Sequence, residues 1–152
     1  MVTLVSGGMD STLMAVLAKE AGVEQFPLFI QYGQLCFERE INACLDVHLK
    51  FNLPKPDVMD VRGFGALISS GLTSRNKLVN EDAFLPGRNL LFLLLGASYA
   101  YEKGCDSIAI GLLSEEYHIF PDQTRNFLSK SEEIFGLSMG KRIQIIAPLM
   151  EF

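Results

Sequence analysis

Tryptophan is absent from this sequence, and histidine and cysteine are rare. The 152 residues include two histidines and three cysteines. Cys36, Cys44 and Cys105 form no CxxC pair, and no histidine has the spacing of a zinc ligand, so we expect reduced thiols and no zinc site in this chain. We expect His48 on a solvated helix face, whereas His118 lies in a loop where it is a candidate for a general base.

Long apolar runs are also missing. The longest candidate, Leu90 to Ala100, is too short to span a membrane and predicts a buried helix that packs in the core. The chain does not open with the basic residues and apolar core of a signal peptide. We therefore expect a cytoplasmic protein with no membrane partner.

Positive charge is in deficit. Lysine and arginine number 13 against 18 acidic residues, which gives a net charge of −5. This balance argues against binding along a nucleic-acid backbone, so no nucleic-acid partner is expected, but it does not exclude a nucleotide held by a loop. Hydrophobic residues make up 49% of the chain. At this length and composition, residues 1–152 are expected to form one domain with a buried core.

Apolar runs alternate with helical patterns, which predicts an α/β fold with an open, mostly parallel five-stranded sheet and helices on both faces. Strands are expected at 2–5, 25–31, 57–61, 106–111 and 141–149. Helices are expected at 11–21 and 35–51, after 86–89 up to about 102, and after 121–122 up to about 135. Residues 62–86 lack periodicity, and such a long connection is typical of a lid or a binding segment.

The segment Ser6-Gly7-Gly8-Met9-Asp10-Ser11-Thr12 joins the first expected strand to the first helix. A strand that turns through two glycines into a helix directs backbone N–H groups and the positive end of the helix dipole at one point, where an anion can bind. The Ser6, Ser11 and Thr12 hydroxyls can add hydrogen bonds. Asp10 is either the N-cap of the helix or a ligand of a phosphate-bound Mg²⁺.

This segment is neither GxxxxGK[ST] nor GxGxxG, so it predicts neither of those nucleotide-binding loops. The glycine pair alone would also fit an ordinary capped turn. The full SGGMDST resembles the PP-loop (SGGxDS) of the ATP pyrophosphatases, enzymes that cleave ATP between the α and β phosphates.

In an open sheet of this kind, ligands bind beyond the carboxyl ends of the strands. The segments expected there, besides the loop, are Tyr32–Gln34, Phe84–Asn89 and Gly111–Asp122. Five of the candidates in them have a structural alternative: Tyr32 and Gln34 could close a turn, Asn89 and Asp122 could cap helices, and Arg88 could cap a loop or pair with Glu81 or Asp82.

Five stretches occur in the order typical of one branch of the PP-loop enzymes. They are Ile30-Gln31-Tyr32-Gly33-Gln34, Leu85-Pro86-Gly87-Arg88-Asn89, Gly111 after an apolar strand, Phe120-Pro121-Asp122 and Ala147-Pro148-Leu149. Together they resemble the 7-cyano-7-deazaguanine synthase (QueC or ExsB) family over essentially the whole chain. The resemblance implies a Rossmann-like fold of the adenine nucleotide alpha hydrolase-like type.

The resemblance also implies an AMP-forming carbon–nitrogen ligase that uses ATP and Mg²⁺. Such an enzyme activates 7-carboxy-7-deazaguanine as an acyl-adenylate, and ammonia converts it by way of an amide to the nitrile, in queuosine precursor biosynthesis. A homodimer is an expected assembly. We expect Asp10, Ser11 and Arg88 as catalytic residues, Ser6 to Thr12 as the ATP loop with Asp10 as the Mg²⁺ ligand, and Tyr32, Gln34, Arg88, Asn89, Gly111 and Asp122 as substrate residues.

Two departures from the family pattern leave alternatives open. The C-terminal cysteine cluster that binds Zn²⁺ is absent, so the chain is truncated, trimmed or a divergent member. The usual PDCR is Pro121-Asp122-Gln123-Thr124, with Arg125 displaced by one position. A QueC-like enzyme that adenylates another substrate, for example in bacterial defence, and a non-catalytic nucleotide-binding module are therefore the alternative functions.

Overall fold

A computed structural model of the chain describes residues 1–77, 83–117 and 119–151. Its strands are β1 (Val2–Val5), β2 (Phe26–Gln31), β3 (Asp57–Asp60), β4 (Ser107–Ala109) and β5 (Gln144–Ile146). They form one sheet in the order β3-β2-β1-β4-β5, and every neighbouring pair is parallel. The expected open five-stranded parallel sheet is confirmed, with the first strand at its centre.

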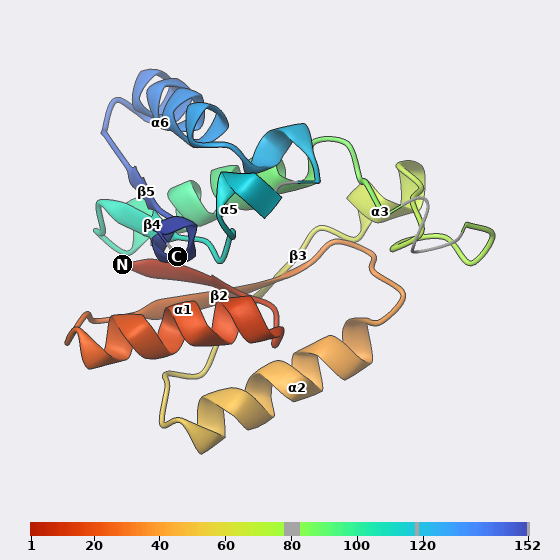
Figure 1. Cartoon of the computed structure of the whole chain (residues 1–152), viewed down its shortest axis with the longest axis horizontal. Coiled ribbons are helices and arrows are strands. Elements are labelled where there is room, and N and C mark those ends of the chain that lie inside the picture. Colours follow the sequence, from red (N-terminus) through yellow and green to blue (C-terminus); the bar gives the residue numbers. More distant parts are fainter. Residues whose placement is uncertain (78–82, 118, 152) are drawn as a thin grey trace.

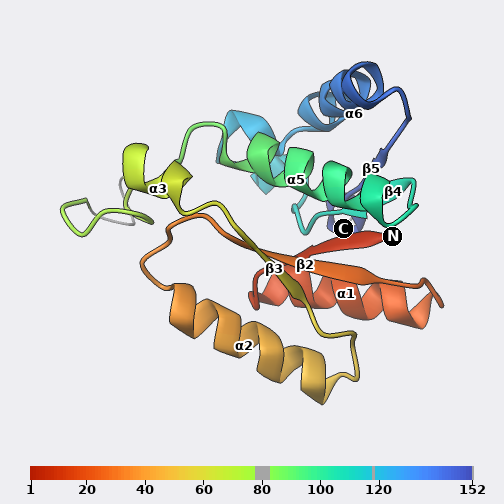
Figure 2. The ribbon, with the colours of Figure 1, turned by 180° about the vertical axis from the view of Figure 1, so that it is seen from behind.

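Helices cover both faces of the sheet, as expected (Figures 1 and 2). The α-helices are α1 (Met9–Glu20), α2 (Phe37–Lys50), α3 (Gly63–Leu67), α5 (Arg88–Glu102) and α6 (Arg125–Met139). Short 3₁₀ helices are η1 (Glu115–Tyr117), η2 (Pro121–Gln123) and η3 (Pro148–Glu151). In Figure 1, α1 and α2 lie on one side of the strands, and α5 and α6 lie on the other.

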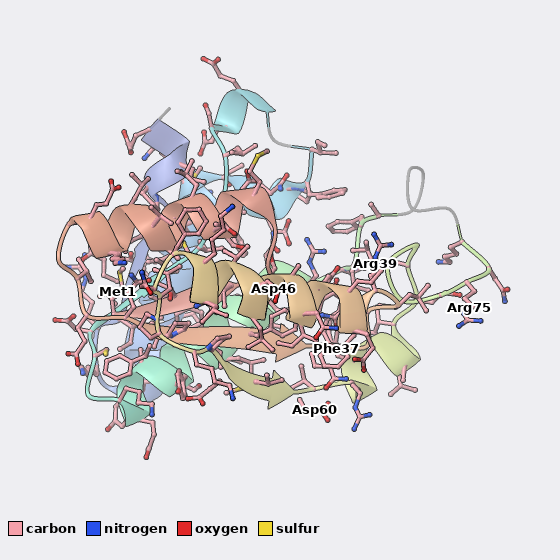
Figure 3. All side chains as sticks on the ribbon, turned by 90° about the horizontal axis from the view of Figure 1, so that it is seen from below. Met1, Phe37, Arg39, Asp46, Asp60 and Arg75 are labelled. Carbon is pink, nitrogen blue, oxygen red and sulfur yellow. The ribbon has the colours of Figure 1, made fainter. Side chains whose placement is uncertain are left out.

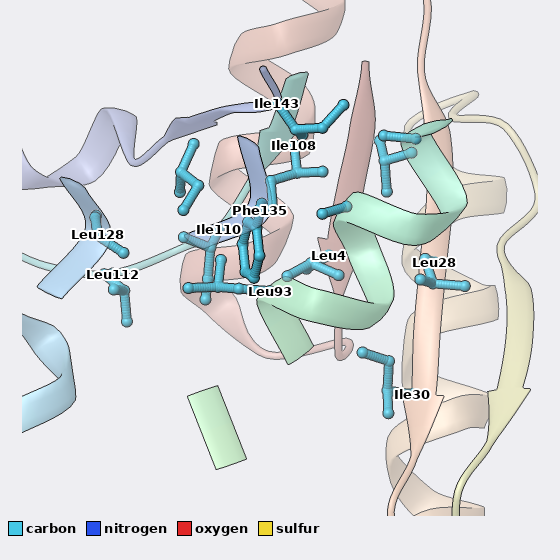
Figure 4. Close-up of a cluster of buried hydrophobic side chains, with 14 of the residues drawn as sticks. Leu4, Leu28, Ile30, Leu93, Ile108, Ile110, Leu112, Leu128, Phe135 and Ile143 are labelled. Carbon is cyan, nitrogen blue, oxygen red and sulfur yellow. The ribbon is translucent and has the colours of Figure 1, made fainter. Parts of the chain in front are cut away.

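Two apolar cores explain why the strands consist of continuous apolar runs, since a parallel sheet is buried on both faces. The larger core joins strand residues such as Leu4 and Ile108 to Leu93 of α5 and Phe135 of α6 (Figure 4). The smaller core lies under α1 and α2 and includes Phe29. No helix among the described residues combines the length and the apolar character that crossing a membrane requires.

Three capping interpretations are wrong. The first helix begins at Met9 after the N-cap Gly8, so Asp10 lies inside the first turn. Asn89 is the second residue of α5, whose N-cap position is held by Gly87. Thr124 caps α6, since its side chain accepts a hydrogen bond from the Phe127 N–H at 3.2 Å, and Asp122 lies in the preceding 3₁₀ helix. The side chains of Asp10, Asn89 and Asp122 therefore do not serve as N-caps of these helices and can make other interactions.

Two expectations about burial also need correction. His48 is buried rather than solvated, and its Nδ1 lies 2.6 Å from the Pro54 carbonyl oxygen, so it joins the end of α2 to the following loop. The apolar run that begins at Leu90 packs in the core only in part, because Leu93 is fully buried whereas Leu90 and Leu94 are 38% and 41% exposed. His118, Glu81 and Asp82 lie outside the described residues.

Candidate functional site

The glycine loop packs against the backbone of α2. Gly7 has φ +78°, and a Cβ atom at this position would lie 2.6 Å from the Cys44 nitrogen and 2.8 Å from the Glu40 carbonyl oxygen. The left-handed conformation and the close approach both require glycine here. Buried next to the loop, Cys44 has a pKa raised to about 11 by desolvation, so its thiol stays protonated and unreactive at neutral pH.

The hydroxyl groups of the loop hold its own backbone together. Ser11 Oγ accepts from the Ser6 N–H at 3.2 Å and donates to the Gly8 carbonyl at 3.1 Å. Thr12 Oγ1 donates to the same carbonyl at 2.8 Å, and Ser6 Oγ accepts from the Gly8 N–H at 3.3 Å. The N–H groups of the first turn of α1, from Met9 to Ser11, have no hydrogen-bond acceptor within the described chain. The loop is therefore shaped by its hydroxyls, and the free N–H groups are in the arrangement with which helix starts can bind anions.

Gly111 follows β4 and touches the first turn of α1. A Cβ atom on it would lie 3.0 Å from both the Asp10 carbonyl carbon and the Ser11 nitrogen. The structure thus shows a packing reason for this glycine, because a side chain would press on the turn that carries the free N–H groups. Its expected substrate contact stays a prediction.

A cavity of about 370 Å³ lies at the carboxyl ends of the strands. Most of the expected site residues line it: Ser6, Gly8, Met9, Asp10, Ser11, Tyr32, Gln34, Arg88, Asn89 and Gly111. Three expected residues are not part of its lining: Gly7, Thr12 and Asp122. The loop and the two central motifs therefore meet at one site, although their chemical roles stay predictions.

Arg88 places its charge beside two aromatic rings in this cavity. Its guanidinium carbon lies 6.0 Å from the centroid of the Tyr32 ring and 5.8 Å from that of Phe92, and the two rings are 5.2 Å apart. Burial raises the pKa of Tyr32, and the nearby Arg88 charge offsets part of that rise. The phenol stays protonated at neutral pH and can donate a hydrogen bond to an anionic ligand.

Both the oxygen and the nitrogen of the Gln34 side-chain amide form local hydrogen bonds. Its Oε1 accepts from the Tyr32 N–H at 2.9 Å, and its Nε2 donates to the Ile30 carbonyl at 3.2 Å and to Glu40 Oε2 at 3.2 Å. Gln34 thus fixes the turn that presents Tyr32, as the turn-closing alternative predicted. It also orients Glu40, a cavity residue that sequence reasoning missed, as it missed Phe92.

Asn89 and Asp122 connect two segments that flank the cavity. Asn89 is 5% exposed, and its Nδ2 donates to the Asp122 carbonyl oxygen at 3.3 Å. The Oδ1 atom of Asp122 is buried and has no hydrogen-bond partner in the described chain. Buried polar atoms are normally paired, so this oxygen is available to a donor group of a ligand near the cavity.

Carboxylates near the loop are too few to form a metal cage. Among the described residues, no group of three or more His, Cys, Asp or Glu side chains is placed to hold a metal ion. Mg²⁺ commonly uses one or two carboxylates together with substrate phosphates and water. Asp10, in the first turn of α1 and in the cavity lining, fits this arrangement only when nucleotide oxygens complete the coordination.

The fold and the loop define a class of protein: a Rossmann-like, adenine nucleotide alpha hydrolase-like PP-loop domain. The structure is similar to that of a predicted tRNA methyltransferase subunit from Methanocaldococcus jannaschii, with a TM-score of 0.62 and 20% identity over 99% of this chain and 68% of that one. It is also similar to a 4-thiouridine synthetase solved with RNA and bound ATP, with a TM-score of 0.55 and 18% identity over 99% of this chain and 36% of that one.

Sequence comparison identifies the family within this class. The pattern of the queuosine biosynthesis protein QueC matches residues 1–152, so the chain belongs to the QueC family. It is 31% identical to the 7-cyano-7-deazaguanine synthase of Oceanobacillus iheyensis, over 99% of this chain and 72% of that protein. It is 35% identical to 7-cyano-7-deazaguanine synthase 1 of Desulfitobacterium hafniense, over 97% of this chain and 69% of that protein.

Proposed function

We propose that this chain binds ATP at the Ser6–Thr12 loop and uses it to activate a carboxylate by adenylation. The carboxylate is that of 7-carboxy-7-deazaguanine, and ammonia then yields 7-cyano-7-deazaguanine. The observation that carries this proposal is that the phosphate loop, Asp10 and Arg88 line the same cavity. Adenylation requires two anionic reactants to be brought together, and this cavity offers N–H groups and a cation for them.

The loop fits the leaving pyrophosphate of the reaction. The unpaired N–H groups at the start of α1 and the helix dipole favour an anion at this point. Mg²⁺ bound to the phosphates would neutralise charge, and Asp10 is the residue that would hold it. The apolar part of the lining, which includes Ile30 and Leu4, suits a nucleobase.

Arg88 is suited to the carboxylate. Its guanidinium group is in no ion pair among the described residues, and a planar guanidinium binds a carboxylate through two parallel hydrogen bonds. Tyr32 lies beside it with a protonated hydroxyl that can donate to the same carboxylate or to the α-phosphate. Both residues would stabilise negative charge where carboxylate and phosphate meet.

The test is incubation of the protein with ATP, Mg²⁺, ammonium and 7-carboxy-7-deazaguanine, with products identified by mass spectrometry. We expect the nitrile together with AMP and pyrophosphate. The variant Arg88→Lys keeps the charge but loses the planar fork, and it separates carboxylate recognition from simple charge neutralisation. Binding of ATP without AMP or pyrophosphate would contradict the proposal and leave a non-catalytic nucleotide-binding module.

One observation favours a second candidate, a QueC-like enzyme that adenylates a different acceptor. Gln123 lines the cavity, and its Oε1 accepts from the Ile119 and Phe120 N–H groups at 2.9 and 3.0 Å. The displaced Arg125 turns away, with Nη2 donating to the Met150 carbonyl at 3.0 Å and Nη1 paired with Glu151 at 2.8 Å. The cavity wall therefore differs chemically from the usual PDCR segment, and AMP release without the nitrile would identify a different acceptor.

A further inference from the structure

Glu40 lies where two cavities meet. Besides the cavity described above, an outer cavity of about 740 Å³ lies between the loop and α2. Arg39 and Asp46, both carried by α2 (Figure 3), are among the residues that line this outer cavity. Ser6, Gly8 and Glu40 line both cavities. Glu40 is therefore the ionisable residue shared by the inner site and the outer cavity.

The carboxylate of Glu40 is held in position from one side. Its Oε2 accepts a hydrogen bond from Gln34 Nε2 at 3.2 Å. Gln34 is itself fixed by the Ile30 carbonyl and the Tyr32 N–H. The position of this carboxylate is thus set by the end of β2 as well as by its own helix.

No lysine or arginine of the described chain forms an ion pair with this carboxylate, which lies in the first turn of α2. The four ion pairs among the described residues do not include Glu40. Arg88 borders the inner cavity and Arg39 the outer one, yet neither lies within ion-pair distance of it. A partly buried carboxylate without a counter-ion attracts a small cation from solution.

We propose that Glu40 binds the ammonium ion that supplies the nitrogen of the reaction, and that the outer cavity is its entry route. This inference rests on the proposed function, because that reaction needs a nitrogen donor. Ammonia in neutral water is mostly ammonium, whose N–H groups are donors, and a carboxylate is purely an acceptor, so the two are complementary. Mg²⁺ is the other small cation at hand, and the test below distinguishes it.

The chemical step balances with water as the final proton acceptor. Ammonium held by Glu40 loses one proton to water in the outer cavity and becomes ammonia. The nitrogen lone pair forms a C–N bond to the acyl carbon of the adenylate, and the C–O bond to AMP breaks, so AMP leaves with the electron pair. A second proton leaves the nitrogen as the neutral amide forms.

The test compares the wild type with Glu40→Gln, which keeps the shape of the side chain and removes its charge. Amide formation is measured against ammonium concentration. We expect the KM for ammonium to rise about tenfold to a hundredfold, the range for losing a hydrogen bond to a charged group, while kcat at saturating ammonium changes little. Glu38→Gln, an exposed change on the same helix, is the matched control and should leave this KM unchanged.

Hydroxylamine provides a second readout, because it is mostly neutral near pH 8 and needs no carboxylate to bind it. Glu40→Gln should form the hydroxamate as fast as the wild type does. An unchanged KM for ammonium would overturn the proposal, and so would an equal loss of amide and hydroxamate, which would indicate a general structural role.

Exchange of labelled pyrophosphate into ATP, without any nitrogen source, measures adenylation alone. We expect Glu40→Gln to retain exchange with an unchanged Mg²⁺ requirement. A raised Mg²⁺ requirement would assign the carboxylate to the metal and overturn the ammonium proposal. No exchange in the wild type would instead refute the proposed function, so the two failures are distinguishable.

Discussion

At Gly7, the backbone conformation and the neighbouring backbone of α2 together leave no room for a side chain. Its φ is +78°, and a Cβ atom there would lie 2.6 Å from a backbone nitrogen of α2. Gly104 has a similar φ of +70° with no atom near the added Cβ, so it provides a matched control. We expect Gly104→Ala to cost about 1 to 2 kcal/mol of unfolding free energy from backbone strain alone.

Gly7→Ala should cost clearly more than Gly104→Ala, because a steric clash with backbone adds to the strain. It should also displace the loop and weaken ATP binding. Urea unfolding measures the first effect, and isothermal titration with ATP measures the second. Equal losses of stability in the two variants, with ATP affinity retained in both, would contradict the packing described for Gly7.

Tyr99 couples α5 to the edge strand β3 through a hydrogen bond from its hydroxyl to Asp57 Oδ2. Burial and then the Asp57 carboxylate raise the pKa of this phenol from 10.0 to about 12. The unfolded chain loses this proton at lower pH than the folded chain does, so the stabilisation is complete below pH 10 and is lost as the pH rises toward about 12.

Tyr99→Phe removes the titrating group. The unfolding free energy of the variant should therefore fall less steeply with pH above about pH 10 than that of the wild type. Urea unfolding at a series of alkaline pH values measures the slope. Tyr101→Phe changes an exposed ring on the same helix and serves as the control. Parallel slopes for Tyr99→Phe and the wild type would contradict the coupling to Asp57.

Among the elements, the start of α6 can be tested with one side chain. Thr124 Oγ1 accepts from the Phe127 N–H at 3.2 Å, the only side-chain N-cap bond found for the described α-helices. We expect Thr124→Ala to lower the unfolding free energy by about 1 kcal/mol. Ser129→Ala, on the exposed surface of the same helix, should change it much less. If urea unfolding shows a smaller loss of stability for Thr124→Ala than for Ser129→Ala, Thr124 does not stabilise α6 as its N-cap.

The elements also show where sequence reasoning reached its limit. The strands were predictable because β1, β2 and β4 carry apolar residues that both faces of the sheet bury. The capping errors at Asp10, Asn89 and Asp122 arose because polar residues near a helix start suit the cap and the first turn alike. Glu40 was missed because its approach to the loop depends on how α2 packs against Gly7, and no local pattern encodes that distance.

At the scale of the whole molecule, ligand binding should appear as added stability. A ligand that binds the folded chain alone stabilises it by about 2.7 kcal/mol at a hundredfold excess over its Kd. We expect ATP and pyrophosphate to raise the thermal midpoint, since both fill the loop, and AMP to raise it much less at equal concentration. Thermal unfolding with each ligand measures this order. A larger shift with AMP than with pyrophosphate would contradict phosphate binding at the loop.

The Ser6–Thr12 loop is packed against neighbouring backbone on two sides, at a glycine on each side. Gly7 rests on α2, and Gly111 rests on the first turn of α1. Folding of the sheet and its helices therefore already restricts the loop to one shape. An arriving phosphate chain has little further disorder to remove, so more of the contact free energy is expressed as affinity. Because the loop packs closely against both neighbours, a substitution within it would also disturb their packing. We therefore expect sequence changes that alter the specificity of this site to occur at the cavity walls rather than in the loop.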